Sequence, residues 1–235
     1  MKTIGLIGGM SWESSLVYYR LINEAVRARL GGLHSAKCIM YSVDFAEIEP
    51  LQHQGRWDEA AEKMIEAARH VEDGGADLIV LCTNTMHKTA DAMEKHVAVP
   101  LLHIADATAE RVRTERLSKV GLLGTRFTME DDFYKGRLID KHGLEVAIPP
   151  EDEREVVHQI IYDELCLGQI KGASRQRYRE IMANLVRQGA QCVILGCTEI
   201  GLLVGPDDSA VPVFDTTRIH AEAAVEHALH DSDSP

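Results

Sequence analysis

Short apolar runs alternate with longer amphipathic segments along most of the chain. The apolar runs end in glycine, proline or small polar residues, which is the pattern of buried strands. The predicted strands are 3–9, 38–45, 77–83, 99–105, 119–125, 144–150, 191–197 and 211–216. The segments between them mostly have helical spacing, and one of them places Ala60, Met64, Ala67 and Val71 on one stripe. Alternating strands and helices predict an α/β fold whose parallel sheets are covered on both faces.

The second half of the chain repeats the first. GGADLIVLCTNT (74–85) and QGAQCVILGCTE (188–199) match without gaps at an offset of 114. IGLIGG (4–9) matches VGLLGT (120–125) at an offset of 116, and VPLLHIAD (99–106) matches VPVFDTTR (211–218) at an offset of 112. Three segments in the same order at nearly one offset indicate a duplicated unit.

The duplication predicts two pseudosymmetric domains, each a parallel four-stranded sheet flanked by helices. We expect the first domain at 1–104 plus 215–235 and the second at 105–214. The C-terminal helix (216–229) has no sheet of the second half left to cover, so we expect it to pack on the first domain. Ligands of open parallel sheets bind at the carboxyl ends of the strands, so we expect the active site in a cleft between the domains.

The composition narrows the class of protein. The chain has 235 residues, is 45% hydrophobic and 26% charged, and so is typical of a soluble globular protein. No apolar stretch approaches the roughly 18 residues that cross a membrane, and the N-terminus does not resemble a signal peptide, so we expect a cytoplasmic protein. The formal net charge of -12 argues against nucleic acid and anionic membrane as partners, whereas a small-molecule substrate fits.

The sequence contains no pattern of a cofactor or metal site. The five cysteines include no Cys-x-x-Cys pair, and the eleven histidines lack metal-binding spacing, so we predict no metal and no disulfide framework. The Gly8-Gly9-Met10-Ser11 turn is not a dinucleotide fingerprint, and no Walker motif is present.

Two cysteines stand near the strand ends that the repeat makes equivalent. The alignment sets Thr83 opposite Cys197, and Cys82 opposite Gly196. Cys197 precedes a predicted helix, whose N-terminus is expected to lower the thiol pKa and favour a base or nucleophile. A buried structural cysteine is an equally good interpretation. Cys82 is expected to point to the opposite face of the strand from Thr83 and to be buried and inert. The alternation of side chains is less regular at the end of a strand, so a role for Cys82 in the site stays open.

Small polar residues after the strands are candidates for helix caps or for binding a carboxylate. Thr128 to Asp131 fits a capping box. Backbone N–H groups at several equivalent strand ends are also a ready site for a carboxylate. His87 is expected in a first helical turn or at the surface, and Cys166 in a helix core.

Together these segments resemble the aspartate/glutamate racemase family of cofactor-independent amino-acid racemases. The resemblance runs the whole length of the chain, through GLIGGMSWES, SVDFAEIE, CTNTMH, LGTRFTM, IYDELCLGQ, GCTEIGLL and PVFDTT. The nearest branch is that of the bacterial broad-specificity amino-acid racemases. The resemblance implies two pseudosymmetric domains, commonly assembled as a homodimer, no cofactor, and a small amino-acid substrate.

In that family two cysteines flank the substrate α-carbon, and one removes the proton that the other replaces on the opposite face. The match carries one of these roles onto Cys197 and places Thr83, a hydroxyl, where the other cysteine usually stands. Racemisation needs an acid and a base on opposite sides of one carbon, and a duplicated domain supplies two equivalent positions. The substrate-binding residues that we expect are Met10, Ser11, Gln52, Asn84, Thr85, Thr125, Thr128, Thr198 and Glu199.

The chain departs from the aspartate-specific relatives in its basic residues. Cys166 stands in the helix where such relatives carry a basic residue, and Gln52 is the nearest polar candidate beside SVDFAEIE. The resemblance therefore leaves open the substrate side chain. Decarboxylases and cis-trans isomerases of the same superfamily, or a catalytically weak amino-acid-binding protein, are the alternative functions.

Overall fold

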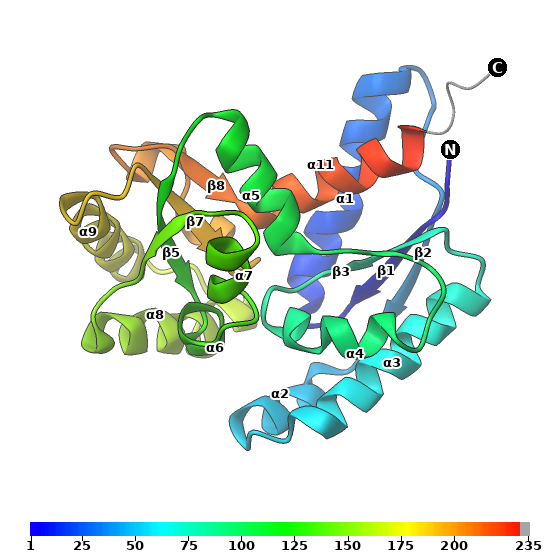
Figure 1. Ribbon diagram of the computed structural model, residues 1–235, viewed down its shortest axis with the longest axis horizontal. Helices are drawn as coiled ribbons and strands as arrows, with labels where there is room; N and C mark the ends of the chain where they lie inside the picture. Colours follow the sequence, from blue (N-terminus) through cyan, green and yellow to red (C-terminus); the bar gives the residue numbers. More distant parts are fainter. Residues whose placement is uncertain (231–235) are drawn as a thin grey trace. The chain divides into compact units, whose positions relative to one another are not determined.

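Two parallel four-stranded sheets carry the fold, as the computed structural model shows for residues 1–230 (Figure 1). The first sheet has the order β2-β1-β3-β4 and the second the order β6-β5-β7-β8. The strands are β1 (Ile4–Gly8), β2 (Cys38–Ser42), β3 (Leu78–Leu81), β4 (Leu101–Leu102), β5 (Lys119–Gly124), β6 (Glu145–Ala147), β7 (Cys192–Gly196) and β8 (Val213–Asp215). The predicted α/β fold with two equivalent four-stranded sheets is confirmed.

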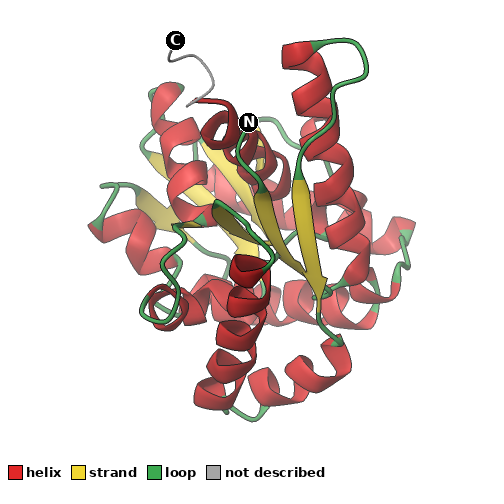
Figure 2. Cartoon of the chain, turned by 90° about the vertical axis from the view of Figure 1, so that its right-hand side faces the viewer, coloured by secondary structure: helices red, strands yellow, loops and turns green. Residues whose placement is uncertain are grey.

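Helices flank the strands of both sheets (Figure 2). The α-helices are α1 (Trp12–Leu30), α2 (Phe45–His53), α3 (Trp57–Asp73), α4 (Ala90–Glu94), α5 (Ile104–Thr114), α6 (Arg126–Glu130), α7 (Lys135–Asp140), α8 (Glu151–Asp163), α9 (Gly172–Arg187), α10 (Ile200–Leu203) and α11 (Thr216–Leu229). Three short 3-10 helices are η1 (Thr85–Thr89), η2 (Leu165–Leu167) and η3 (Pro206–Asp208). Among residues 1–230, none of the helices combines the length and apolarity that a membrane span requires.

The chain divides into two units. Unit 1 comprises Met1–His103 and His220–Pro235, and unit 2 comprises Ile104–Ile219. The predicted domain limits, 1–104 with 215–235 and 105–214, stay a prediction, and residues 231–235 of the first domain lie outside the described residues.

The pairing of strands within each sheet agrees with the internal alignment of the sequence. Pairs in the first sheet recur in the second at the same offsets: Ile7↔Leu81 with Leu123↔Leu195, and Ile79↔Leu101 with Val193↔Val213. Thr83 and Cys197 therefore follow equivalent strands at equivalent positions. Because the alignment was made on sequence alone, the ladders support the duplication independently.

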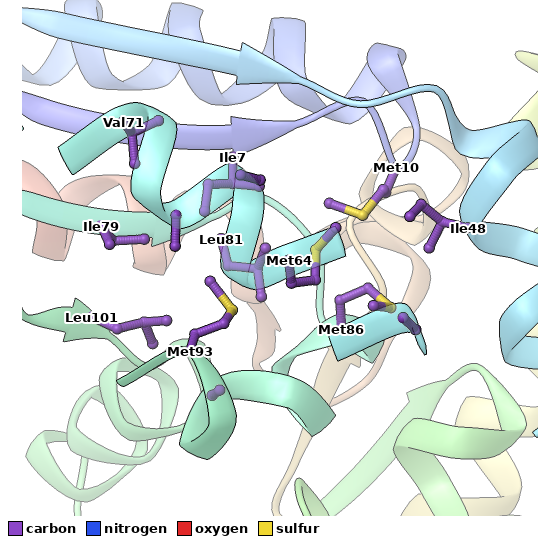
Figure 3. Close-up of a cluster of buried hydrophobic side chains, with 14 of the residues drawn as sticks. Ile7, Met10, Ile48, Met64, Val71, Ile79, Leu81, Met86, Met93 and Leu101 are labelled. Carbon is purple, nitrogen blue, oxygen red and sulfur yellow. The ribbon is translucent and has the colours of Figure 1, made fainter. Parts of the chain in front are cut away.

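Alternate residues of β3 belong to two separate cores of unit 1. Ile79 and Leu81 pack with the apolar stripe of α3, whose predicted members Ala60, Met64, Ala67 and Val71 are all buried (Figure 3). On the other face, Cys82 continues the row of Leu78 and Val80 and packs with residues of α1 and α11. Side chains alternate between the faces of a strand, so this row determines where the Cys82 thiol points.

Helix α11 packs on the first sheet, as expected. Its residues Ala221, Ala224 and Val225 are fully buried in the core that contains β1 and β3 residues. The backbone N–H of Lys2 donates to the carbonyl of Ala228 at 2.9 Å. The end of the chain therefore contributes to the unit that contains its beginning.

Several predicted element boundaries differ from the structure, and three of the differences have a clear local cause. The strand predicted to reach residue 45 ends at Ser42, because the Asp44 side chain accepts the Ala46 N–H at 3.0 Å and starts α2. The strand predicted at 99–105 contains only Leu101–Leu102, because the following apolar residues already form the first turn of α5. The cap of α6 is Thr125, not Thr128: the Thr125 hydroxyl accepts the Thr128 N–H at 3.3 Å, and Thr128 lies inside the helix.

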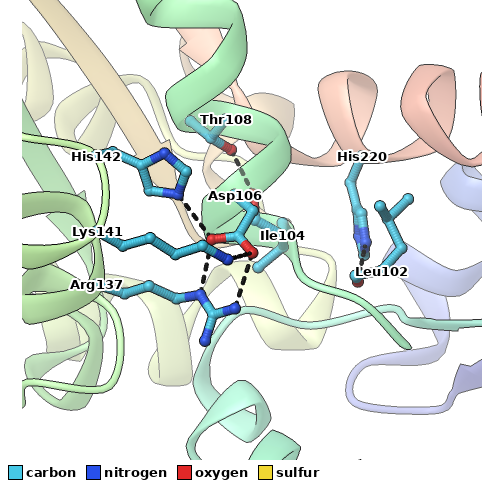
Figure 4. Close-up of polar contacts among 8 residues, drawn as sticks. All are labelled: Leu102, Ile104, Asp106, Thr108, Arg137, Lys141, His142 and His220. Carbon is cyan, nitrogen blue, oxygen red and sulfur yellow. Dashed lines mark hydrogen bonds and ion pairs between the residues drawn. The ribbon is translucent and has the colours of Figure 1, made fainter. Parts of the chain in front are cut away.

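In unit 2, one carboxylate ties α5 to the segment that contains α7 (Figure 4). Asp106 accepts hydrogen bonds from Arg137 at 2.7 and 2.8 Å, from Lys141 at 2.7 Å and from His142 at 2.8 Å. Burial alone would raise the pKa of Asp106, but these three partners hold it far below the ordinary value. The three partners therefore favour the ionised form of the carboxylate.

Candidate active site

A glycine turn joins β1 to α1 at the carboxyl edge of the first sheet. Gly9 has a φ of +95°, and a Cβ at this position would collide with the Val43 carbonyl, so only glycine fits. The Gly9 N–H donates to the Ser15 hydroxyl at 2.8 Å. Ser11 caps α1, with its hydroxyl accepting the Ser14 N–H at 3.5 Å. The turn thus places the start of a long helix beside the end of β1.

The loop after β3 contains Thr83, Asn84 and Thr85, all of them buried. The Thr83 N–H donates to the Leu81 carbonyl at 2.8 Å, and the Thr83 carbonyl lies 2.7 Å from the His87 Nδ1. Asn84 precedes η1 but makes no side-chain capping bond to it. Helix capping, the competing interpretation of this residue, therefore does not account for Asn84.

Cys82 lies in the core, as predicted. Its side chain is fully buried, and its Sγ is 3.7 Å from the Val80 carbonyl. Burial raises the pKa of the Cys82 thiol far above its ordinary value. Burial in an apolar core favours the neutral thiol, which agrees with the prediction of a structural cysteine.

Two further candidates in unit 1 are also buried. The Met10 side chain lies among Ile48 and other members of the α2–α3 core rather than on an open surface (Figure 3). Gln52, on α2, is buried, and its Nε2 donates to the Met86 Sδ at 3.0 Å. The Met10 side chain therefore belongs to the core, and the Gln52 amide is bonded to a core methionine.

In unit 2, Thr128 packs over the ends of β5 and β7. A Cβ at Gly124 would lie 3.0 Å from the Thr128 Cβ, and a Cβ at Gly196 would lie 3.1 Å from its Cγ2. Glycine at both strand ends allows this close approach. Gly196, the equivalent of Cys82, therefore has no room for a side chain.

Cys197 forms a buried pair with a carboxylate. Its Sγ donates to the Glu199 Oε2 at 3.0 Å, and the Thr198 hydroxyl donates to the same oxygen at 2.7 Å. All three side chains are buried. Burial, followed by the negative charge of Glu199, raises the pKa of the Cys197 thiol well above its ordinary value.

The expectation that a helix N-terminus lowers this pKa is wrong. The helix after Cys197, α10, has only the four residues Ile200–Leu203, and the thiol is buried against a carboxylate. Burial and the neighbouring negative charge both favour the neutral thiol. The resting residue is therefore protonated, and its ionisation requires an acceptor for the proton.

The model of the Asp/Glu/hydantoin racemase family matches residues 7–224. The chain belongs to this family. Membership makes the protein an isomerase of the amino-acid racemase class, and the whole of both sheets lies within the match except for the start of β1.

Individual relatives of the racemase extend over nearly the whole chain. The broad specificity amino-acid racemase RacX of Bacillus subtilis is 23% identical over 94% of this chain and 96% of its own. A Yersinia pestis protein, named as a candidate Asp/Glu racemase, is 58% identical with a TM-score of 0.90, covering 97% of this chain and 100% of that one. An aspartate racemase homologue of Pyrococcus horikoshii is 38% identical with a TM-score of 0.83, covering 97% and 99%.

Two features of this racemase were missed by sequence reasoning. Glu199 was expected beside the substrate, whereas its contact with Cys197 gives it a second possible role. His87 is in the first turn of a short helix, as one interpretation had it, but it is buried and not at the surface. The spacing of four residues between Thr83 and His87 was the available signal, because such residues face each other across one helical turn.

Within residues 1–230, no cluster of His, Cys, Asp and Glu has the makeup of a metal site.

Proposed function

We propose that the protein is a cofactor-independent racemase of free amino acids in which Cys197 and Thr83 act on opposite faces of the substrate α-carbon. The observation that carries the proposal is the equivalence of these residues in the two strand ladders, combined with the carboxylate beside Cys197. A racemase needs one proton acceptor and one proton donor on opposite sides of the plane of the developing carbanion. Equivalent positions on duplicated units supply such a pair.

The Cys197 side has the means to act as a base. A neutral thiol cannot remove an α-proton, but the Glu199 Oε2 lies 3.0 Å from the Sγ and accepts its hydrogen bond. In the proposed step, the S–H proton moves to Glu199, and the thiolate then forms a new S–H bond with the proton of the α-carbon. The electron pair of the broken C–H bond is delocalised into the substrate carboxylate.

That carboxylate needs donors, since negative charge develops on it during the reaction. We assign this role to the start of α1, with the backbone of Met10 and the capping residue Ser11. Polar side chains at the strand ends and on the neighbouring helices complete the binding site in this proposal: Gln52, Asn84, Thr85, Thr125, Thr128 and Thr198. Their residue types fit the recognition of a zwitterion.

The Thr83 side is the weaker half of the proposed pair. A hydroxyl is a far weaker acid than a thiol, so it removes a proton slowly unless a neighbour or water assists. We therefore propose that one enantiomer is the effective substrate. Because both enantiomers are equally stable, the asymmetry appears as a difference in kcat that is compensated in KM.

Side-chain selection is proposed to be loose. The position where aspartate-specific relatives carry a basic residue is occupied by Cys166, half-buried in η2. With a net charge of -12, the protein suits a free cytoplasmic amino acid better than a polyanionic partner. Aspartate, glutamate, homoserine and lysine compared under one condition test this; exclusive activity on aspartate that depends on one Arg or Lys contradicts it.

A homodimer is the proposed assembly. Helix α1 exposes Trp12 (64%), Leu16 (60%) and Tyr19 (49%) at the spacing of one helical face. An exposed apolar stripe of this kind suits a two-fold contact with a second copy. Light scattering of the wild type and of Leu16→Glu is the test: a monomeric wild type, or a variant that stays dimeric, contradicts this interface.

Incubation with each enantiomer in deuterium oxide tests the proposed reaction. A racemase incorporates deuterium at the α-carbon and inverts it, a decarboxylase of the same superfamily releases carbon dioxide, and a binding protein does neither. Cys197→Ala is the control, since it should abolish inversion and should also abolish incorporation from the enantiomer whose α-proton faces Cys197. Inversion that persists in Cys197→Ala would remove Cys197 from the mechanism.

A further inference from the structure

Four buried polar rings lie together behind the loop that contains Thr83. The His87 and His103 rings are 4.6 Å apart, and the His87 and His220 rings are 5.8 Å apart. The Tyr18 hydroxyl is 2.9 Å from the His220 Nδ1. All four side chains belong to unit 1 and are buried, and we call them the histidine cluster.

The hydrogen bonds of the cluster settle which ring nitrogens carry protons. A carbonyl oxygen only accepts, so the His87 Nδ1 must donate to the Thr83 carbonyl at 2.7 Å. For the same reason the His220 Nε2 donates to the Leu102 carbonyl at 2.8 Å (Figure 4). Burial lowers the pKa of His220 to about 3, so its ring is neutral at working pH and its Nδ1 accepts from Tyr18.

The corresponding positions of unit 2 do not carry this arrangement. At the offsets of the alignment, His87 corresponds to Gly201 and His103 corresponds to Asp215. In unit 2 a Cβ at position 201 would lie 2.9 Å from the Asp215 Oδ2, so an imidazole there would have to displace the Asp215 carboxylate. The Cys197 carbonyl instead accepts the backbone N–H of Ile200 at 3.2 Å.

We propose that His87 is a positioning residue for Thr83, an inference that rests on the catalytic role of Thr83 proposed above. Both backbone polar groups of Thr83 are hydrogen-bonded. The Thr83 N–H donates to the Leu81 carbonyl, and the Thr83 carbonyl accepts from the His87 ring. The cluster in turn holds the His87 ring, since His103 and His220 pack against it. His87 transfers no proton in this scheme.

The physical reason is the weakness of the Thr83 hydroxyl as an acid or base. A poor proton donor or acceptor works only when its oxygen is held close to the line of transfer, because small misplacements cost large factors in rate. Hydrogen bonds that orient metal ligands are typically worth about 10- to 100-fold in affinity or activity, and we expect an effect of the same order for a group that orients Thr83. The thiol of Cys197 has a carboxylate partner, and its loop lacks the imidazole.

The test compares proton exchange at the two faces of the α-carbon. Thr83→Val identifies the enantiomer whose α-proton faces Thr83, because only this enantiomer loses deuterium incorporation. His87→Leu removes the donor but keeps an apolar side chain in the buried site. We expect it to slow exchange of the Thr83-facing enantiomer by at least about tenfold, with exchange of the other enantiomer changed less than about twofold and KM values unchanged.

Two matched variants separate positioning from general damage to the fold. His103→Leu removes a buried ring of the same cluster that does not bond to Thr83, so the ratio of the two exchange rates should remain that of wild type. His87→Asn places an amide N–H near the position of Nδ1 and should recover much of the lost rate. Thermal unfolding of all variants, followed by circular dichroism, reports the cost in stability.

The outcomes distinguish the two proposals. If Thr83→Val leaves exchange of both enantiomers intact, the catalytic role of Thr83 is wrong, and the role of His87 is overturned with it. If Thr83→Val is selective but His87→Leu slows both faces equally or neither, only the positioning role is overturned. A His103→Leu variant with the same selective loss as His87→Leu would also contradict it, since the Thr83 carbonyl bond would then not be the cause.

Discussion

The loop after β3 and the loop after β7 have equivalent places in their sheets but different chemistry. Residue by residue, Cys82-Thr83-Asn84-Thr85 in unit 1 corresponds to Gly196-Cys197-Thr198-Glu199 in unit 2. The second loop pairs a thiol with a carboxylate at 3.0 Å. The first has a hydroxyl in place of the thiol and a threonine in place of the carboxylate. Duplication preserved the backbone register and left the proton chemistry of each half free to diverge.

The difference also concerns what supports each loop. Glu199 bonds directly to the Cys197 side chain, whereas His87 bonds to the Thr83 backbone. A carboxylate beside a buried thiol changes its proton equilibrium, whereas a donor to a carbonyl changes only position. The comparison therefore predicts that Glu199 controls how readily Cys197 loses its proton. It also predicts that His87 controls the position of Thr83, the weaker of the two proton-transfer groups.

The largest expected effect is the loss of the thiol itself. Cys197→Ser should lower racemisation by about 10²- to 10⁴-fold, the usual contribution of general base catalysis, because an alcohol ionises far less readily than a thiol. Loss of optical rotation with the best amino acid measures the rate, and Cys38→Ser, at a half-buried position of β2, is the control. Near-full activity of Cys197→Ser would mean that the thiol is not the base that distinguishes the loop after β7 from the loop after β3.

The next largest effect is expected from removal of the Glu199 carboxylate. Glu199→Gln should lower kcat by about 10- to 100-fold at neutral pH, because the thiol loses its proton acceptor, and the loss should shrink as the pH is raised. The negative charge of Glu199 raises the pKa of Cys197, so its removal should move the midpoint of alkylation by iodoacetamide to lower pH. Glu153→Gln, a buried carboxylate bonded to Asn184, is the matched control and should change neither quantity.

Acid should affect the stability of unit 1 before that of unit 2. The folded pKa of His220 is lowered to about 3 from 6.5, so the unfolded state binds more protons between these values and stability falls as the pH falls. From neutral pH to pH 5 the loss is about 2 kcal/mol. The pKa of Asp106 is lowered from a value of 3.8, so its contribution is retained until the pH falls below that range.

The difference between wild type and His220→Gln isolates this contribution. Glutamine does not titrate, and its amide N–H replaces the donor to the Leu102 carbonyl. Urea unfolding at pH 7 and pH 5 should show a smaller loss for the variant than for wild type. Equal losses in both proteins would show that His220 is not the group that responds to acid.

The smallest expected effect is the repair of the weaker loop. Thr83→Cys should raise the slow direction of proton removal by about tenfold, because a thiol is the stronger acid, whereas Cys82→Ala should change little. Deuterium incorporation from each enantiomer in the three proteins measures both. An inactive Cys82→Ala together with an unchanged Thr83→Cys would mean that the register of the repeat is wrong and that Cys82 is the second base.

Much of the architecture could be predicted from the sequence alone. The alternation of apolar runs with helical stripes predicted both sheets, and the offsets near 114 predicted that the second unit repeats the first. The inward direction of Cys82 followed as well, because strand side chains alternate with a strict period of two. These features depend on periodicity and local order, which are present in the chain before it folds.

The tertiary structure decided the state of the chemical groups. Local reasoning assigned Cys197 a lowered pKa from a helix start, but burial and the position of Glu199 reversed the sign. The Met10 side chain went into the core, and His87 joined His103 and His220, which come from distant parts of the chain. A pKa or a hydrogen bond depends on which atoms surround a group and how much water they displace, and neighbours remote in sequence are brought there only by folding.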